Sequence, residues 1–292
     1  MKPPPFDYVV ARDVEHALDT LREVGDDAKL LAGGQSLVPL LSLRLARPTL
    51  LVDVNRIPRM SDIRGDDGQI RLGALVRHRK LETSSTVARE FPLLREAAGW
   101  IAHPQIRTRG TLGGSLAHAD SAAELPVVLA ALDATVTARS AGGRRTIPVA
   151  ELSVAHLVSC LEPDEMITEV QIPRLPPGTG SAFDEFARRH GDYAIGAAAA
   201  VITLNADGVC VGARIAVLGA GDPGLVRRTD AETRLIGTDI GPEQLEEIAA
   251  QAVMDLRPPP NLHADAQYRR DVIRTMIIRT VRTAADRART TT

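Results

Sequence analysis

The stretch Leu31-Ala32-Gly33-Gly34-Gln35-Ser36-Leu37 decides how this chain folds, and Arg109-Gly110-Thr111-Leu112-Gly113-Gly114-Ser115-Leu116 repeats its pattern further along. Each stretch places two consecutive glycines before a small polar residue. Glycine adopts positive φ without strain and lets the backbone approach a ligand closely. Successive N–H groups in such a turn form a concave anion site. Either stretch alone could be only a tight turn, whereas the two together could hold one diphosphate from both sides.

The residues on either side of the first stretch predict a small α/β unit over residues 7–54. Asp13 is a suitable N-cap for a helix, whose apolar positions recur at helical spacing until Gly25. A short buried strand at 29–32 leads into the glycine pair, a helix over about 36–45 follows it, and a second strand covers 49–54.

The second stretch lies in a longer segment that a proline- and glycine-rich linker ends at 173–180. Beyond the linker, two strands flank the hairpin turn Asn205-Ala206-Asp207-Gly208, and helices follow them. Strands followed by helices favour an α+β arrangement over a doubly wound sheet. The expected elements are strands at 69–74, 135–138, 144–147, 166–172, 194–204 and 209–218, and helices at about 86–101, 123–132, 229–236, 242–255 and 264–287.

Composition excludes several classes of function. Of the 292 residues, 44% are hydrophobic and 25% charged, and the net charge of −2 gives no electrostatic basis for binding nucleic acid. No apolar run is long enough to span a bilayer, so we expect no integral membrane segment. The first residues lack the apolar core of a signal peptide, and we therefore expect a cytoplasmic location.

Cysteine and histidine usage bears on redox cofactors and metals. The chain has two cysteines, Cys160 and Cys210, and a [2Fe–2S] cluster needs four ligands that are usually all cysteine. This chain therefore cannot form such a cluster alone. His118 and Asp120 are close in sequence but have no third ligand at a suitable spacing, so we predict no metal site.

Several segments together resemble a known family, the medium subunit of aerobic carbon monoxide dehydrogenase. The same module is the flavin domain of xanthine dehydrogenases and other molybdenum hydroxylases. The two glycine stretches look like the FAD-diphosphate motifs of that family, and the resemblance covers nearly the whole chain. It extends to Leu51-Val52-Asp53-Val54, Ala117-His118-Ala119-Asp120, Ala123-Glu124-Leu125-Pro126 and Arg188-Arg189-His190-Gly191-Asp192-Tyr193-Ala194.

The resemblance implies an α+β protein of two domains. Residues 1–176 would form a two-lobed FAD-binding domain of the vanillyl-alcohol-oxidase (PCMH) type, with lobes of about 1–55 and 56–176. Residues 177–292 would form a smaller α+β domain of the carbon monoxide dehydrogenase flavoprotein type, with strands first and helices afterwards.

The resemblance also implies which residues bind the cofactor. Neither glycine stretch contains a His or Cys as an attachment point, so we expect the FAD to be non-covalent. Asp120 and Glu124 would lie on the ribose side, Leu161 near the adenine or flavin edge, and Tyr193 beside the isoalloxazine. The residues expected at the diphosphate are Ala32, Gly33, Gly34, Gln35, Ser36, Leu37, Thr111, Leu112, Gly113, Gly114 and Ser115.

Two positions depart from the family pattern. The family often has Asn where Ser115 stands; serine has a shorter reach but keeps a donor. A Lys is common near the flavin where this chain has Glu185. Since a nearby cation favours the anionic reduced flavin, this change is expected to make the flavin harder to reduce.

The implied function is electron transfer within a molybdenum hydroxylase complex, with no catalytic residue expected in this chain. Electrons would arrive from a [2Fe–2S] partner and leave to NAD⁺, a quinone or oxygen. The partners would be a small iron–sulfur subunit and a large molybdopterin subunit, in a dimer of heterotrimers. One alternative is a self-sufficient FAD oxidoreductase that acts directly on a small molecule, and another is a non-catalytic scaffold with degenerate turns. The sequence names neither the substrate nor the electron acceptor.

Overall fold

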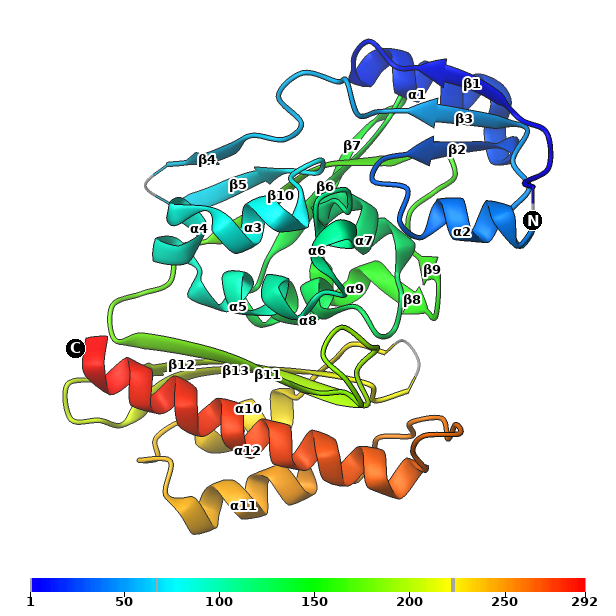
Figure 1. Cartoon of the computed structure of the whole chain (residues 1–292). Coiled ribbons are helices and arrows are strands. Elements are labelled where there is room, and N and C mark those ends of the chain that lie inside the picture. The colour runs from blue at the N-terminus through cyan, green and yellow to red at the C-terminus, as the bar shows by residue number, and fades with distance from the viewer. Residues whose placement is uncertain (1, 67, 222–223, 292) are drawn as a thin grey trace.

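The computed structural model describes residues 2–66, 68–221 and 224–291 (Figure 1). The first lobe is a three-stranded parallel sheet of order β1-β3-β2, which is covered by helix α1. The Asp13 side chain caps α1 by accepting a hydrogen bond of 2.7 Å from the His16 N–H, as predicted. The elements are β1 (Asp7–Val10), α1 (Val14–Val24), a 3₁₀ turn (Gly25–Asp27), β2 (Ala28–Leu31), α2 (Leu37–Ser42) and β3 (Leu50–Asp53).

The second lobe is a five-stranded antiparallel sheet of order β4-β5-β10-β6-β7, with helices packed beside it (Figure 1). Its strands are β4 (Ile63–Gly65), β5 (Gln69–Gly73), β6 (Thr135–Ser140), β7 (Gly143–Pro148) and β10 (Met166–Pro173), and a small hairpin joins β8 (Ser153–Ala155) to β9 (Val158–Ser159). Its helices are α3 (His78–Thr83), α4 (Ser85–Glu90), α5 (Pro92–Trp100), α6 (Pro104–Arg107), α7 (Leu112–His118), α8 (Glu124–Ala131) and α9 (Val149–Leu152).

The predicted helix over 86–101 is two helices, because Pro92 breaks it. Proline lacks an N–H group and pushes the preceding residue out of the helical region. Phe91 accordingly has φ −141° and ψ 70°, and α5 begins at Pro92 itself. In contrast, α8 is apolar on all sides and is buried from Leu125 to Ala131, at the centre of the molecule.

The C-terminal part is a four-stranded antiparallel sheet of order β11-β12-β13-β14, with three helices on one face (Figure 1). The prediction missed β11, because its first residues follow the prolines and glycines that indicated a linker; the actual connection runs only from the end of β10 to Thr179. The elements are β11 (Thr179–Phe186), β12 (Gly196–Leu204), β13 (Cys210–Leu218), β14 (Val226–Arg227), α10 (Thr229–Leu235), α11 (Pro242–Gln251) and α12 (Ala266–Thr291).

The C-terminal sheet is buried on both faces. Because successive side chains of a strand point to opposite faces, neighbouring residues pack against different layers. Ala197, Ala199 and Val201 of β12 belong to the core of the first two lobes, whereas Ala198 and Ala200 pack with the C-terminal helices. The sheet therefore joins the C-terminal helices to the lobes. The mixture of helices and strands confirms the predicted α+β class. Within the described residues, no helix combines the length and apolar character needed to cross a membrane.

Candidate functional site

A cavity of about 1060 Å³ lies where the two lobes and the C-terminal part meet. Fourteen of the fifteen residues predicted to bind the cofactor line it, although they come from four separate segments of the chain. Leu112 is the exception, because its side chain is fully buried in the core. The fourteen are Ala32, Gly33, Gly34, Gln35, Ser36, Leu37, Thr111, Gly113, Gly114, Ser115, Asp120, Glu124, Leu161 and Tyr193.

The first glycine stretch forms a turn between β2 and α2 with unused backbone donors. Gly34 has φ +74°, a conformation that favours glycine. No described residue accepts a hydrogen bond from the N–H groups of residues 33–37, five in succession. Ser36 precedes α2 but its hydroxyl makes no capping hydrogen bond, so it is also available. This turn has the donors that an anionic group requires.

The second stretch is not a turn, and the prediction of a second row of free N–H groups is wrong. Thr111 is the N-cap of α7, and its Oγ1 accepts from the Gly114 N–H at 3.2 Å. The N–H groups of Leu112 and Gly113 donate to the carbonyls of Val76 and Ala74, at 2.9 and 2.8 Å. The glycines serve close packing instead: a Cβ on Gly113 would lie 2.5 Å from the Ala74 Cβ. This stretch therefore offers the cavity the hydroxyls of Thr111 and Ser115.

The two stretches are in direct contact. A Cβ on Gly33 would lie 2.4 Å from the Arg109 carbonyl oxygen, so only glycine allows this approach. The Arg77 guanidinium links the two stretches. It donates hydrogen bonds to the Arg109 carbonyl and, at 2.7 Å, to Asn55 Oδ1. Asn55 in turn donates to the Ala32 carbonyl at 2.8 Å. Sequence reasoning missed Asn55 and Arg77, since nothing local to either residue indicates this role.

His78 packs against the second glycine stretch. It is buried, its Nε2 lies 3.0 Å from the Thr111 carbonyl oxygen, and its Nδ1 has no partner among the described residues. Burial lowers the pKa of His78 to about 4. The ring is therefore neutral at physiological pH, and since a carbonyl can only accept, its proton lies on Nε2. A Cβ on Gly110 would lie 2.7 Å from Nδ1, which explains a further glycine.

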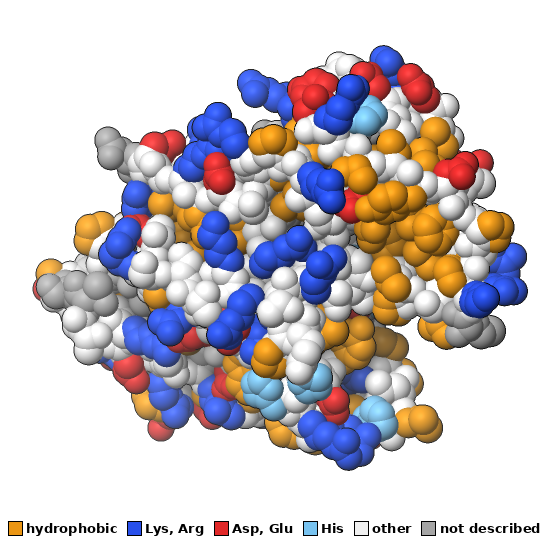
Figure 2. Space-filling model, turned by 45° about the horizontal axis from the view of Figure 1, so that its top comes forward, with side chains coloured by type: hydrophobic (Ala, Val, Ile, Leu, Met, Phe, Trp, Pro, Cys, Tyr) orange, Lys and Arg blue, Asp and Glu red, His pale blue; other side chains and the backbone are white. Residues whose placement is uncertain are grey.

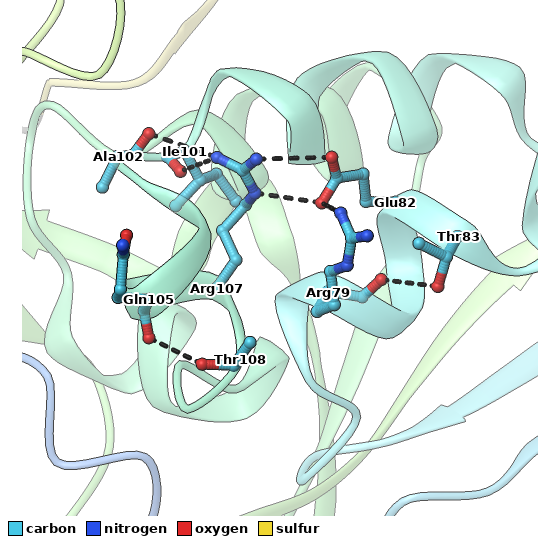
Figure 3. A network of polar contacts seen from close by, with 8 residues as sticks. All are labelled: Arg79, Glu82, Thr83, Ile101, Ala102, Gln105, Arg107 and Thr108. Carbon is cyan, nitrogen blue, oxygen red and sulfur yellow. Dashed lines mark hydrogen bonds and ion pairs between the residues drawn. The ribbon is translucent and has the colours of Figure 1, made fainter.

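Ile101, Ala102 and Ile106 line another wall of the cavity. An ion pair between the buried Arg107 and the partly exposed Glu82 supports this wall, and Figure 3 shows its contacts. The Arg107 guanidinium donates to the carbonyls of Ile101 and Ala102, at 2.9 and 3.2 Å. Its Nε and Nη2 donate hydrogen bonds to the two carboxylate oxygens of Glu82, at 3.0 and 3.3 Å. Ala102 has φ +39°, which is unusual for a residue other than glycine, so these bonds stabilise a strained turn.

Two carboxyl groups at the cavity have raised pKa values: Glu124 lines the cavity and is partly exposed, whereas Glu185 is buried beside it. Burial, with the charge of Asp120 adding to it, raises the pKa of Glu124 to about 7. Glu185 is 5% exposed and neither of its carboxylate oxygens has a hydrogen-bond partner among the described residues. Burial first, then Glu124 and Asp184, raise the pKa of Glu185 to about 8. Glu185 is therefore mostly protonated at neutral pH and adds little negative charge beside the cavity.

The C-terminal part completes the cavity. Tyr193 is 74% exposed, and its pKa is raised by desolvation first and then by the charges of Asp120 and Glu124. This effect places Tyr193 near both acids of the second lobe. The resemblance pointed to Tyr193, but it did not single out Arg188 and Asp192 of the same segment, nor the lining residues that are distant in sequence: Asn261, His263 and Arg269. No three His, Cys, Asp or Glu side chains come together as a possible metal site in the described part of the chain.

Comparisons with known proteins agree with this architecture. The family model described as the FAD binding domain in molybdopterin dehydrogenase matches residues 4–175. The model of the CO dehydrogenase flavoprotein C-terminal domain matches residues 181–284. The structure superimposes on carbon monoxide dehydrogenase from Hydrogenophaga pseudoflava with a TM-score of 0.95 and 35% identity, covering 98% of this chain and 99% of that one. It is similar to quinoline 2-oxidoreductase from Pseudomonas putida 86, with a TM-score of 0.93 and 35% identity, covering 99% of each chain.

Sequence relatives are named as subunits of dehydrogenases, and one of them is the xanthine dehydrogenase FAD-binding subunit of Escherichia coli O157:H7. The chain is 58% identical to the 6-hydroxypseudooxynicotine dehydrogenase complex subunit alpha of Paenarthrobacter nicotinovorans, covering 100% of this chain and 98% of the relative. It is 35% identical to the carbon monoxide dehydrogenase medium chain of Hydrogenophaga pseudoflava, covering 97% and 98%. These matches confirm the resemblance found in the sequence, and the chain belongs to the FAD-binding medium subunits of the molybdenum hydroxylases.

Proposed function

We propose that this chain holds non-covalent FAD in the cavity between its lobes and passes electrons from a [2Fe–2S] subunit to an external acceptor. The observation that carries the proposal is a row of five N–H groups, at residues 33–37, that have no acceptor among the described residues. This row lies on the wall of a cavity of about 1060 Å³. When bound, FAD exchanges electrons singly and in pairs, so this chain has to hold and tune it without a general base of its own.

The geometry supports a division of labour among the cavity residues. The diphosphate would accept hydrogen bonds from the N–H groups of residues 33–37 and from the hydroxyls of Ser36, Thr111 and Ser115. Asp120 and Glu124 would bind ribose hydroxyls, while Leu161 and Tyr193 would contact ring systems. Leu112 would contribute only through packing of α7, since its side chain is buried and its N–H is engaged.

We propose that the two domains are residues 1–176, with lobes of about 1–55 and 56–176, and residues 177–292. The connection between β10 and β11, from Pro173 to Thr179, supports this division. The C-terminal sheet still shares a core with the lobes, which supports one rigid cavity rather than two hinged halves.

The partners would be a small iron–sulfur subunit and a large molybdopterin subunit in a cytoplasmic dimer of heterotrimers. Two cysteines are too few for a [2Fe–2S] cluster, so the clusters belong on other chains. Figure 2 shows hydrophobic side chains gathered on the face that carries the first lobe, near the N-terminus. Val38, Leu43 and Leu45, in and after α2, are among the exposed apolar residues, and such exposure supports a protein interface.

Two measurements test the function. Acid precipitation of the purified chain should release FAD, about one per chain, into the supernatant; flavin in the pellet, or none, would contradict non-covalent binding. Native purification followed by metal analysis should recover the chain with iron and molybdenum subunits. Recovery as a metal-free homomer with full turnover of an organic substrate would instead support the self-sufficient oxidoreductase.

We also propose that the complex oxidises 6-hydroxypseudooxynicotine or a closely related compound. The support is the 58% identity to a subunit of that dehydrogenase over 98% of its length, against 35% to a carbon monoxide dehydrogenase medium chain. The native complex should reduce an artificial electron acceptor with this compound and not with carbon monoxide. The opposite preference would refute the assignment.

A further inference from the structure

Arg269, near the start of α12, is buried in the cavity wall, and no carboxylate among the described residues pairs with it. Three arginines of the described residues are buried, and two of them are paired: Arg107 with Glu82 at 3.0 Å, and Arg228 with Asp255 at 2.6 Å. Arg269 is 8% exposed and lines the cavity, but no described carboxylate lies within ion-pair distance of it.

The hydrogen bonds of Arg269 are also incomplete. Its Nη1 donates to the Ile195 carbonyl at 2.9 Å, and its Nε has no partner among the described residues. Desolvation lowers the pKa of Arg269, yet an arginine stays protonated in proteins. A buried positive charge without a counter-charge is unfavourable unless a ligand supplies one. The wall therefore presents a cation to whatever fills the cavity.

We propose that Arg269 is the counter-charge for the negative charge that the isoalloxazine of FAD acquires on reduction. With FAD bound, two electrons from the iron–sulfur partner and one proton from water would give a reduced flavin anion, and Arg269 would face its negative charge at N1 and the C2 carbonyl. The inference rests on the proposed function, because it requires FAD in this cavity.

The position of Arg269 favours the isoalloxazine over the diphosphate. The free N–H groups at residues 33–37 belong to the first lobe, whereas Arg269 belongs to the C-terminal part. Arg269 donates a hydrogen bond to the carbonyl of Ile195. Ile195 is two residues after Tyr193, and Tyr193 lines the same cavity. FAD carries negative charge in two places, the diphosphate and the reduced ring, and the first already has donors.

The other cations at this wall are less suited to the role. Arg188 also lines the cavity, but it is exposed and lies 3.2 Å from the His263 ring, so water screens its charge. Among the described residues, Arg269 is therefore the buried arginine of this wall.

The test compares Arg269→Gln, which removes the charge, with Arg269→Lys, which keeps it. Arg270→Gln is the matched control, since Arg270 donates to the Leu256 carbonyl and Gln267 and does not line the cavity. The dissociation constants of oxidised and reduced FAD are measured anaerobically, together with the two-electron midpoint potential. In Arg269→Gln, the ratio of the dissociation constant of oxidised FAD to that of reduced FAD should fall at least tenfold relative to the wild type. This change corresponds to a two-electron midpoint potential that is lower by about 30 mV. Arg269→Lys should lose less, and Arg270→Gln nothing.

Each other outcome overturns the inference in a recognisable way. Equal weakening of both redox forms by Arg269→Gln would assign the residue to the diphosphate. Equal losses in the Gln and Lys variants would show that the bond to Ile195 matters and the charge does not. If Arg269→Gln weakened the binding of inorganic phosphate by the same factor as the binding of reduced FAD, each relative to the wild type, Arg269 would belong to a general anion site.

The wild-type protein gives a test that needs no variant. If Arg269→Gln fails to fold, the wild type must still bind reduced FAD at least tenfold more tightly than oxidised FAD, and a preference for the oxidised form would refute the proposal. A wild-type chain that binds no FAD would contradict the proposed function and this inference with it. A chain that binds FAD without a redox preference would contradict only this inference.

Discussion

Replacing Glu185 by Gln should make the protein more stable at alkaline pH and leave it nearly unchanged at pH 5. The Glu185 carboxyl is buried with both oxygens unpaired among the described residues, and its pKa is raised to about 8. In the unfolded chain it ionises near its ordinary value of 4.5. The folded protein therefore binds this proton more tightly, and stability falls as pH rises from about 4.5 through about 8.

The size of the effect follows from the two pKa values. Each tenfold difference in proton affinity corresponds to about 1.4 kcal/mol, so full ionisation of Glu185 costs at most about 5 kcal/mol. Between pH 5 and pH 9 the wild type should lose up to about 4 kcal/mol of its free energy of unfolding through this group. Gln cannot ionise, so Glu185→Gln should lose most of that pH dependence. Glu124, whose pKa is raised to about 7, contributes a smaller pH dependence of the free energy of unfolding in both proteins.

Urea unfolding of the FAD-free chain at several pH values, followed by circular dichroism, measures this difference. Trp100, the single tryptophan, stacks on His190 with ring centroids 5.2 Å apart, and its fluorescence reports the contact between the lobes and the C-terminal part. Glu151→Gln is the control, because Glu151 is exposed on α9. Parallel pH profiles for the wild type and Glu185→Gln would show that Glu185 is ionised in the folded protein and would refute this reasoning.

Three further changes probe the cavity. Gly33→Ala should weaken FAD binding at least tenfold in a titration, because its methyl group would lie 2.4 Å from the Arg109 carbonyl oxygen; Gly208→Ala, with nothing within 4 Å, should lower stability by about 1 kcal/mol and leave FAD content unchanged. Arg107→Met should lower the free energy of unfolding by about 2 kcal/mol, since it removes the hydrogen bonds to the strained turn and to Glu82, which keeps only Arg79 as a partner, and a loss below about 0.5 kcal/mol would count against this role. Tyr193→Ala should change the absorbance spectrum or acceptor kinetics of bound FAD more than its affinity, because the side chain is 74% exposed; if spectrum, potential and kinetics all stay the same, Tyr193 is a packing residue.

Local signals predicted much of the fold correctly. The capped helix after Asp13 and the hairpin through residues 205–208 appear where the sequence placed them, and Gly208 has the positive φ that the turn requires. The errors came where a local signal was interpreted too simply. Prolines near the start of β11 concealed a strand, and Pro92 divides a helix that hydrophobic spacing alone predicts as continuous.

By itself, the sequence determined the two glycine stretches, the segments that flank them and the family to which they belong, because backbone conformation and close approach depend on residue type at fixed positions. Only the tertiary structure decided that the N–H groups of residues 33–37 find no acceptor among the described residues, while N–H groups of the second stretch donate to the carbonyls of residues 74 and 76. It alone decided that Glu185 is buried and that Arg269, far away in the chain, faces the same cavity. Charge, burial and hydrogen-bond pairing depend on neighbours that the fold brings together from distant parts of the chain, and no local pattern encodes them.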